Sequence, residues 1–242
     1  YITSSYRDTI FKRIVTTKLG TKKYLYSDLG YYFMNEIIQR ISKKTQDVYM
    51  DENFYKPLGL SNIGYKPRVK WDISRIPPTE NDKTFRKQLI HADVHDQGSA
   101  MMNGVAGHAG LFSNANDLAV MMQLFLQYGE YGGERYYKEE TGKLFTSSPY
   151  YKTSTKNRRG IGFDKAVQGG GDGPTCTGCS SSKSFGHSGF TGTITWADPE
   201  NGFVYVFLSN RVYKDAENRK IIKEGIRSKI QFQLLKAANK IK

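Results

Sequence analysis

Two segments with strand composition near the end of the chain constrain its fold more than any other feature. Phe190 to Ala197 and Phe203 to Leu208 are rich in aromatic and β-branched residues, and Asp198-Pro199-Glu200-Asn201-Gly202 between them has the composition of a hairpin turn. In the first segment threonines alternate with Phe190, Ile194 and Trp196, so one face is expected to be covered. Such a hairpin needs further strands beside it, because an unpaired hydrophobic edge favours association.

Helical patterns precede and follow this hairpin. Ser27 to Lys44 carries apolar residues on one face, with Ser27 or Asp28 able to cap its first turn; those residues are Leu29, Tyr32, Phe33, Ile37 and Ile41. Further helices are expected at Val48 to Tyr55, at Leu118 to Tyr128 capped by Asn116, and within Ala216 to Lys242. Helices in the middle, an antiparallel hairpin and a closing helix predict an α+β fold.

Composition narrows the function classes. The 242 residues include 38% hydrophobic side chains, which is enough for a globular core without metal or disulfide support. No apolar run approaches the ~18 residues that a membrane span needs. The net charge is +13, and residues 214 to 242 supply six of these charges with nine basic and three acidic residues. These basic residues alternate with apolar ones at helical spacing, so they predict the solvated face of a docking helix; no recognisable nucleic-acid-binding module is present.

The two cysteines, Cys176 and Cys179, lie in a stretch of glycine and serine from 168 to 184 that reads as a loop of adjustable length. Four ligands make a tetrahedral zinc site, and a second pair of ligands is missing. A surface loop is the favoured interpretation, with a local disulfide or adventitious metal as the alternatives. No metal or cofactor is expected for the function.

A search for a nucleophile gives little. The pattern G-x-S-x-G fails at Gly186 to Phe190, whose fifth residue is not glycine. Serine followed three residues later by lysine occurs once, at Ser180 and Lys183, in the Gly/Ser loop with no apolar helix to hold the pair. We interpret this pair as accidental.

Several motifs, in order along the chain, resemble one family of enzymes. They are Tyr26-Ser27-Asp28 with Leu29-Gly30-Tyr31, Pro57-Leu58-Gly59-Leu60, the small-residue stretch from Gly104 to Ser113 with Asp117-Leu118-Ala119, and His187-Ser188-Gly189-Phe190-Thr191-Gly192-Thr193. The first and last resemble the second and third motifs of class C β-lactamases, DD-peptidases and related serine esterases. In particular, the chain resembles the β-lactamase-like domain fused to family-three glycoside hydrolases in Bacteroidetes.

The resemblance implies an antiparallel sheet flanked by helices, with a helical subdomain, in a single domain from 1 to 242. Residues 1 to 185 would form mainly helices and loops, and 186 to 242 the sheet hairpin and closing helix. The resemblance implies that the family's first motif, S-x-x-K, lies many tens of residues before Tyr26. Only 25 residues precede Tyr26 in this chain. The chain is therefore expected to be the C-terminal two-thirds of the domain, with the nucleophile and early strands outside it and no activity alone.

The resemblance also implies roles for individual residues. Tyr26 would act as general base, since the positive end of a helix dipole stabilises phenolate. Asp28 stands where the family more often has Asn, so it would contact substrate or only cap the helix. His187 stands where β-lactamases usually have Lys, and it would relay a proton or bind a substrate carboxylate.

The residues after His187 would line the cleft. Ser188 would face the substrate, Gly189 would let the backbone approach it, and Phe190 would donate its backbone N–H to an oxyanion hole. His91, His95 and His108 are not spaced as ligands on one helix face and are expected to be structural.

The leading functional hypothesis is a serine hydrolase that acts through an acyl-enzyme on amide or ester bonds of a small-molecule or cell-wall peptide substrate. The alternative is a non-catalytic module that binds cell-wall fragments or supports a fused glycoside hydrolase. By resemblance the protein would be periplasmic or on the cell surface, with no nucleic-acid partner.

Overall fold

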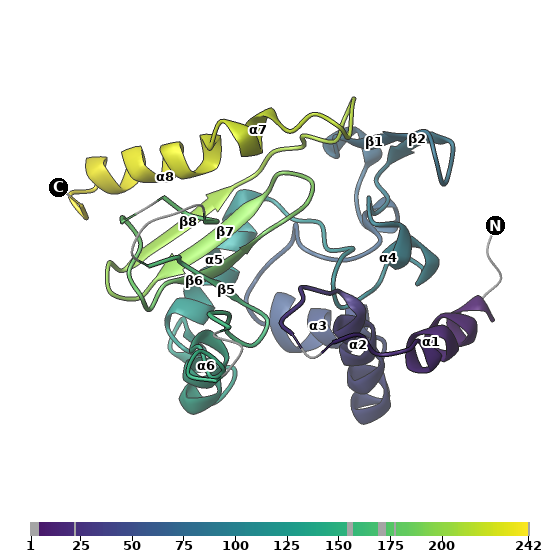
Figure 1. Cartoon of the computed structure of the whole chain (residues 1–242), viewed down its shortest axis with the longest axis horizontal. Helices are drawn as coiled ribbons and strands as arrows, with labels where there is room; N and C mark the ends of the chain where they lie inside the picture. Colours follow the sequence, from purple (N-terminus) through teal and green to yellow (C-terminus); the bar gives the residue numbers. More distant parts are fainter. Residues whose placement is uncertain (1–4, 22, 154–156, 169–172, 177, 242) are drawn as a thin grey trace. The chain divides into compact units, whose positions relative to one another are not determined.

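The computed structural model describes residues 5–21, 23–153, 157–168, 173–176 and 178–241. The chain forms two compact units, Tyr1–Ser113 and Asn114–Lys242. Figure 1 shows the helices and strands of both units. The expectation of a single domain from 1 to 242 stays a prediction.

The first unit is mainly helical, with one small hairpin. Its helices are α1 (Tyr6–Thr16), α2 (Leu29–Ser42), α3 (Gln46–Met50) and α4 (Gln97–Met101), with a π-helical turn at Asp51–Tyr55 and 3-10 turns at Pro67–Val69 and Ile73–Arg75. The antiparallel pair of β1 (Pro78–Asp82) and β2 (Gln88–His91) completes it. The helix predicted from Val48 to Tyr55 is thus α3 plus the π-helical turn.

Helix α2 forms where the apolar spacing predicts it, but its buried residues differ in part from the prediction. Tyr32 is buried, whereas Ile41 is 79% exposed and Leu29 and Ile37 are also exposed. Asn35 is buried instead, because its side-chain amide donates to Gln46 Oε1 at 2.7 Å. A buried amide is tolerated when it is hydrogen-bonded, so the inner face of α2 does not have to be apolar throughout.

The second unit is a four-stranded antiparallel sheet with helices. Its strands run in the order β5 (Asp164–Lys165), β6 (Phe185–Ser188), β7 (Ile194–Asp198) and β8 (Phe203–Phe207). The helices are α5 (Ala115–Leu126), α6 (Glu139–Thr146), α7 (Lys220–Lys223) and α8 (Ile226–Ala237), and a short pair of β3 (Glu130–Tyr131) and β4 (Glu134–Arg135) follows α5. Helix α8 lies along the sheet in Figure 1. The predicted α+β class is confirmed.

The two faces of this sheet are covered by different helices. Trp196 is fully buried on one face, in a cluster with Ile194 and Tyr205 against which Ile230 of α8 packs. Phe185 and Ala197 point to the other face and pack with Met122 of α5. Residues i and i+1 of a strand point to opposite faces, so the alternation in the sequence explains why both helices are needed. The predicted cover over Ile194 and Trp196 is confirmed.

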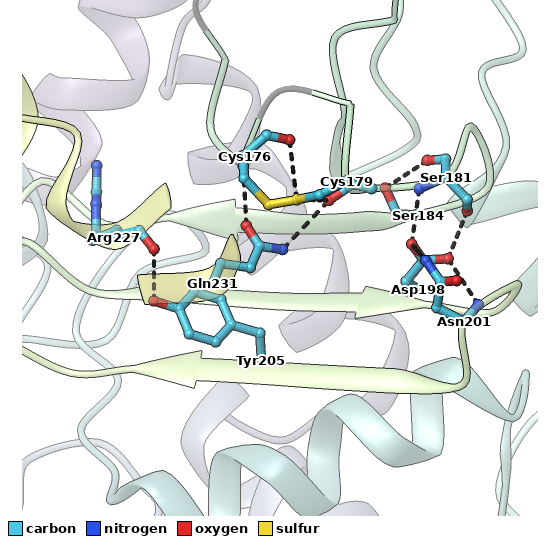
Figure 2. Close-up of a disulfide and its surroundings, with 10 residues drawn as sticks. Cys176, Cys179, Ser181, Ser184, Asp198, Asn201, Tyr205, Arg227 and Gln231 are labelled. Atoms are coloured by element: carbon cyan, nitrogen blue, oxygen red, sulfur yellow. Dashed lines mark hydrogen bonds between the residues drawn. A yellow bond between two sulfur atoms is a disulfide. The ribbon is translucent and has the colours of Figure 1, made fainter. Parts of the chain in front are cut away.

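Two local predictions need correction. The first strand of the predicted hairpin does not begin at Phe190, because Phe190 to Thr193 form the turn between β6 and β7. The cap of α5 is Asn114, whose Oδ1 accepts from the Asp117 N–H at 2.8 Å, and not Asn116. In the predicted turn from 198 to 202, Asp198 is buried and accepts from both the backbone and the hydroxyl of Ser181 (Figure 2).

Cys176 and Cys179 form a disulfide, with their Cα atoms 5.6 Å apart. Both are buried against Leu235 of α8, and Gln231 of the same helix accepts from the Cys176 N–H at 3.2 Å (Figure 2). The favoured interpretation of these cysteines as part of a surface loop is therefore wrong, and the local disulfide is what the structure contains. Helix α8 covers the cysteines and excludes water from them.

Candidate active site

The first predicted motif lies immediately before α2. Tyr26 is 52% exposed in an irregular segment, three residues ahead of the helix. Ser27 Oγ accepts from the Leu29 N–H at 3.2 Å. Asp28 occupies the N-cap position but makes no capping hydrogen bond with its side chain. The sequence offers Ser27 or Asp28 as the capping residue, and Ser27 makes the contact. The Asp28 carboxylate therefore does not cap the helix.

The small-residue stretch around Gly107 holds this end of α2 in place. A side chain at Gly107 would clash with the Tyr31 carbonyl, and one at Gly98 would clash with the Tyr32 hydroxyl. These glycines permit the close approach of the neighbouring backbone to helix α2.

Six residues after Tyr26, on helix α2, Tyr32 packs on the buried side chain of His108. The rings of Tyr32 and His108 stack with centroids 4.6 Å apart, and His108 Nε2 lies 2.9 Å from Asp96 Oδ1. Burial raises the pKa of Tyr32, and the negative charges of Asp96 and Asp28 raise it further. Burial opposes ionisation of Asp96, but hydrogen bonds from His108 and the Ser99 N–H lower its pKa overall. This arrangement fits the structural role expected for His108.

The second predicted motif lies at the end of strand β6. His187 and Ser188 pair with Thr195 and Ile194 of β7, and the ladder with β5 reaches only Gly186. Both side chains are half-buried. His187 therefore lies near the end of a strand whose pairing with β5 stops one residue before it.

A tight turn follows β6 and holds Phe190. The Gly189 N–H donates to the Thr193 carbonyl at 2.8 Å, and the Gly192 N–H donates to the Gly189 carbonyl at 3.1 Å. A side chain at Gly189 would meet Thr193 Oγ1, so this glycine is required by packing inside the turn. The Phe190 ring is 63% exposed. The conformation of residue 190 is set by the turn.

Arg211, in the segment that follows β8, fixes this turn. Its guanidinium lies 4.4 Å from the centre of the Phe190 ring, and its Nε donates to the Phe190 carbonyl at 2.8 Å. The Arg211 backbone N–H donates to the Thr191 carbonyl, also at 2.8 Å. The side chain is almost fully buried, and burial lowers its pKa. Sequence reasoning did not identify Arg211.

A second arginine, also missed from the sequence, contacts His187 directly. Arg159 Nη1 lies 3.1 Å from His187 Nε2, and Arg159 Nη2 lies 3.0 Å from Asp164 Oδ2. Arg158 binds the other oxygen of the buried Asp164 at 2.7 Å. The contact forms because the β5–β6 ladder pairs Asp164 with Gly186, next to His187. In the sequence, the adjacent Arg158 and Arg159 are the signal that could indicate this contact. Their position next to His187 depends on the pairing of β5 with β6, which the local sequence does not reveal.

Ser180 and Lys183 are not arranged as a nucleophile and its base. Ser180 Oγ accepts from Gln231 Nε2 at 3.4 Å, while Lys183 Nζ lies 3.4 Å from Glu200. The interpretation of their spacing as accidental agrees with this geometry.

The candidate residues divide between the two units. Tyr26 and Asp28 belong to the first, and His187, Ser188, Gly189 and Phe190 to the second. The structure brings the members of each group together, and the meeting of the groups in one cleft stays a prediction. Among the described residues, no three His, Cys, Asp or Glu side chains gather as a metal-binding set, and no helix is both long and apolar enough to cross a membrane.

The second unit is an antiparallel sheet packed between helices, and the two predicted motifs lie before a helix of the first unit and at the end of a strand of the second. The family model described as Beta-lactamase matches residues 5–225. The chain therefore belongs to the β-lactamase family.

Curated relatives agree with this assignment. The chain is 36% identical over 202 residues to a protein of Escherichia coli K12 provisionally named D-alanyl-D-alanine carboxypeptidase, covering 78% of this chain and 45% of that protein. A protein of the same name from Salmonella paratyphi B is 35% identical over 213 residues, covering 82% and 48%. The chain thus spans about half the length of the curated relatives it matches.

Solved structures show the same fold. A penicillin-binding protein homologue from Caulobacter crescentus superimposes with a TM-score of 0.58 at 18% identity, covering 86% of this chain and 59% of that one. A β-lactamase from Mycobacterium bovis superimposes with a TM-score of 0.57 at 19% identity, covering 89% and 64%. The predicted β-lactamase/transpeptidase-like fold is confirmed.

Proposed function

We propose that this chain is part of a serine hydrolase that forms an acyl-enzyme and cleaves a D-alanyl-D-alanine peptide of the cell wall. One observation carries the proposal: the family match runs unbroken from residue 5 to residue 225 and includes both motifs, Tyr26-Ser27-Asp28 before α2 and His187-Ser188-Gly189-Phe190 at the end of β6. The names of the curated relatives support a carboxypeptidase over other amide or ester hydrolases.

In this proposal the two motifs have different tasks. Tyr26 is the general base, and Asp28, which makes no capping hydrogen bond with its side chain, contacts the substrate. The turn after β6 contacts the substrate, with Phe190 donating its backbone N–H to the carbonyl oxygen as negative charge develops. The nucleophilic serine lies outside the 242 residues. Ser180 is the one serine with lysine three positions later, but its hydroxyl accepts from Gln231 and Lys183 is paired with Glu200.

A direct assay tests this proposal. The full-length protein that contains this chain is incubated with diacetyl-L-Lys-D-Ala-D-Ala, and released D-alanine is measured. The expected result is turnover, together with a stoichiometric penicillin adduct by intact mass. Tyr26→Phe should lower kcat by ~10²- to 10⁴-fold, the range for loss of a general base, with little change in thermal unfolding because Tyr26 is half exposed.

The alternative is a non-catalytic module that binds cell-wall fragments or supports a fused glycoside hydrolase. It predicts binding of the peptide without release of D-alanine and without a penicillin adduct. A periplasmic or cell-surface location is part of the proposal, since cell-wall peptides are found there, and fractionation of cells tests it.

A further inference from the structure

Four side chains form a charged cluster beside the end of strand β6. They are Arg158, Arg159, Asp164 and His187. Asp164 is buried, and one of its oxygens is bound by each arginine, at 2.7 Å for Arg158 and 3.0 Å for Arg159. Two guanidinium groups sharing one carboxylate leave one net positive charge. The side chain of Arg159 is 22% exposed, so solvent reaches part of it.

The hydrogen bonds of His187 determine where its proton lies. His187 Nδ1 is 2.8 Å from the Ser188 carbonyl oxygen, which can only accept, so Nδ1 carries the hydrogen. His187 Nε2 is 3.1 Å from Arg159 Nη1, which can only donate, so Nε2 presents its lone pair. The two partners therefore select the same neutral tautomer. A second proton on Nε2 would oppose an N–H to an N–H and place two positive charges in contact.

With His187 neutral, the positive charge beside the motif that begins at His187 is carried by Arg159. We propose that Arg159, and not His187, supplies the positive charge at the end of β6 and recognises a carboxylate of the substrate, while the neutral His187 orients the guanidinium. Arg159 is then a specificity-determining residue and His187 a positioning residue. The planar guanidinium suits this role because it binds carboxylates in a fixed fork geometry and stays charged at any working pH.

The inference rests on the proposed function for the identity of the substrate, whose terminal D-alanine has a free carboxylate. It does not require cleavage, because recognition of the carboxylate is a binding step. Asp164 and Arg158 complete the arrangement: Asp164 accepts from Arg159 Nη2 while His187 contacts Nη1, and Arg158 keeps that buried carboxylate paired when Arg159 is changed.

The first test reads the tautomer of His187. The full-length protein is labelled with ¹⁵N-histidine, and long-range ¹H–¹⁵N spectra at pH 7.5 are assigned with H187Q. The expected result is the Nδ1–H form for His187 in the unmodified protein and in R158Q, and loss of that preference in R159Q. An Nε2–H or doubly protonated ring in the unmodified protein overturns the assignment.

The second test reads recognition of the carboxylate. Binding of acetyl-D-Ala-D-Ala and of its C-terminal amide is measured by NMR titration. The free acid should bind ~10- to 100-fold more tightly than the amide, as expected for loss of a charge-assisted hydrogen bond. R159Q should abolish this preference, and R159K should keep only part of it.

R158Q is the matched control, because it removes the same charge from the same carboxylate without touching His187. It should retain the preference for the acid, and circular dichroism should show R159Q and R159K folded. Equal binding of acid and amide, an unchanged preference in R159Q and R159K, or no binding of either peptide would each overturn the proposal. Turnover of diacetyl-L-Lys-D-Ala-D-Ala is measured separately, so failure of catalysis and failure of Arg159 recognition are distinguishable.

Discussion

Replacing the buried lysine of strand β5 should change how the stability of the protein depends on pH. Lys165 Nζ donates to the carbonyls of Thr146 and Lys183, at 2.8 and 3.0 Å, and the residue is only 6% exposed. Burial lowers the pKa of Lys165 to about 8 from 10.5, and the charge of Asp198 opposes this only in part. The carbonyl partners stabilise the ammonium but carry no full charge, so burial dominates.

The sign of the effect follows from which state holds the proton. Below pH 8 both the folded and the unfolded chain carry the charge on Lys165, and this group gives no pH dependence. Between pH 8 and 10.5 the unfolded chain keeps the proton and the folded chain has lost it, so the free energy of unfolding rises with pH. At ~1.36 kcal/mol per pH unit, the difference between 10.5 and about 8 gives a rise of about 3.4 kcal/mol at most, and partial access of water reduces it toward about 2.

The assay is urea unfolding at pH 7.5 to 10.5 for the unmodified chain, Lys165→Met and Lys183→Met. Other lysines and tyrosines also titrate here, so the difference between the unmodified chain and K165M is the quantity of interest. It should grow by about 2 to 3 kcal/mol toward high pH. K183M is the control, because Lys183 is exposed and paired with Glu200, and its difference should stay flat. A pH-independent difference for K165M would refute the reasoning.

Three other outcomes are expected. Penicillin should give no stoichiometric adduct with the 242-residue chain, since Ser180 is not paired with Lys183; an adduct by intact mass that disappears in S180A would contradict this. Arg211→Gln should lower the free energy of unfolding by ~2 to 3 kcal/mol and shift the backbone resonances around Phe190, because charge-assisted hydrogen bonds to this turn are lost; unchanged resonances would argue against its role. Leu235→Ala, at a fully buried position, should cost about 2 to 5 kcal/mol in the same measurement, and a loss under 1 kcal/mol would show that α8 is not packed as described.

Local patterns in the sequence predict the elements well where burial and propensity agree. The alternation around Trp196 predicts strand β7 and its cover, and the helical spacing after Ser27 predicts α2. The start of the hairpin was misplaced because Phe190 to Thr193 have strand composition but are closed into a turn between Gly189 and Gly192. There tertiary pairing overrides propensity.

The candidate site could be predicted only where its residues adjoin in sequence. His187 to Phe190 form one motif and were identified from it. Arg159 and Arg211 lie 28 and 24 residues from His187 and reach the motif through strand pairing and the chain after β8, which no local pattern encodes. Strand β1 was missed for a related reason: it begins at Pro78 and buries polar side chains, so it lacks an apolar alternation.

In the proposed function, Tyr26 before α2 and the Arg159–His187 pair at the end of β6 act on one substrate. A crystal structure of the full-length protein with a bound D-alanyl-D-alanine peptide tests it most directly. We expect Tyr26 Oη within ~3 Å of the reacting group and the Arg159 guanidinium on the terminal carboxylate of the same peptide. A peptide bound with Tyr26 and His187 facing opposite surfaces of the protein would contradict it.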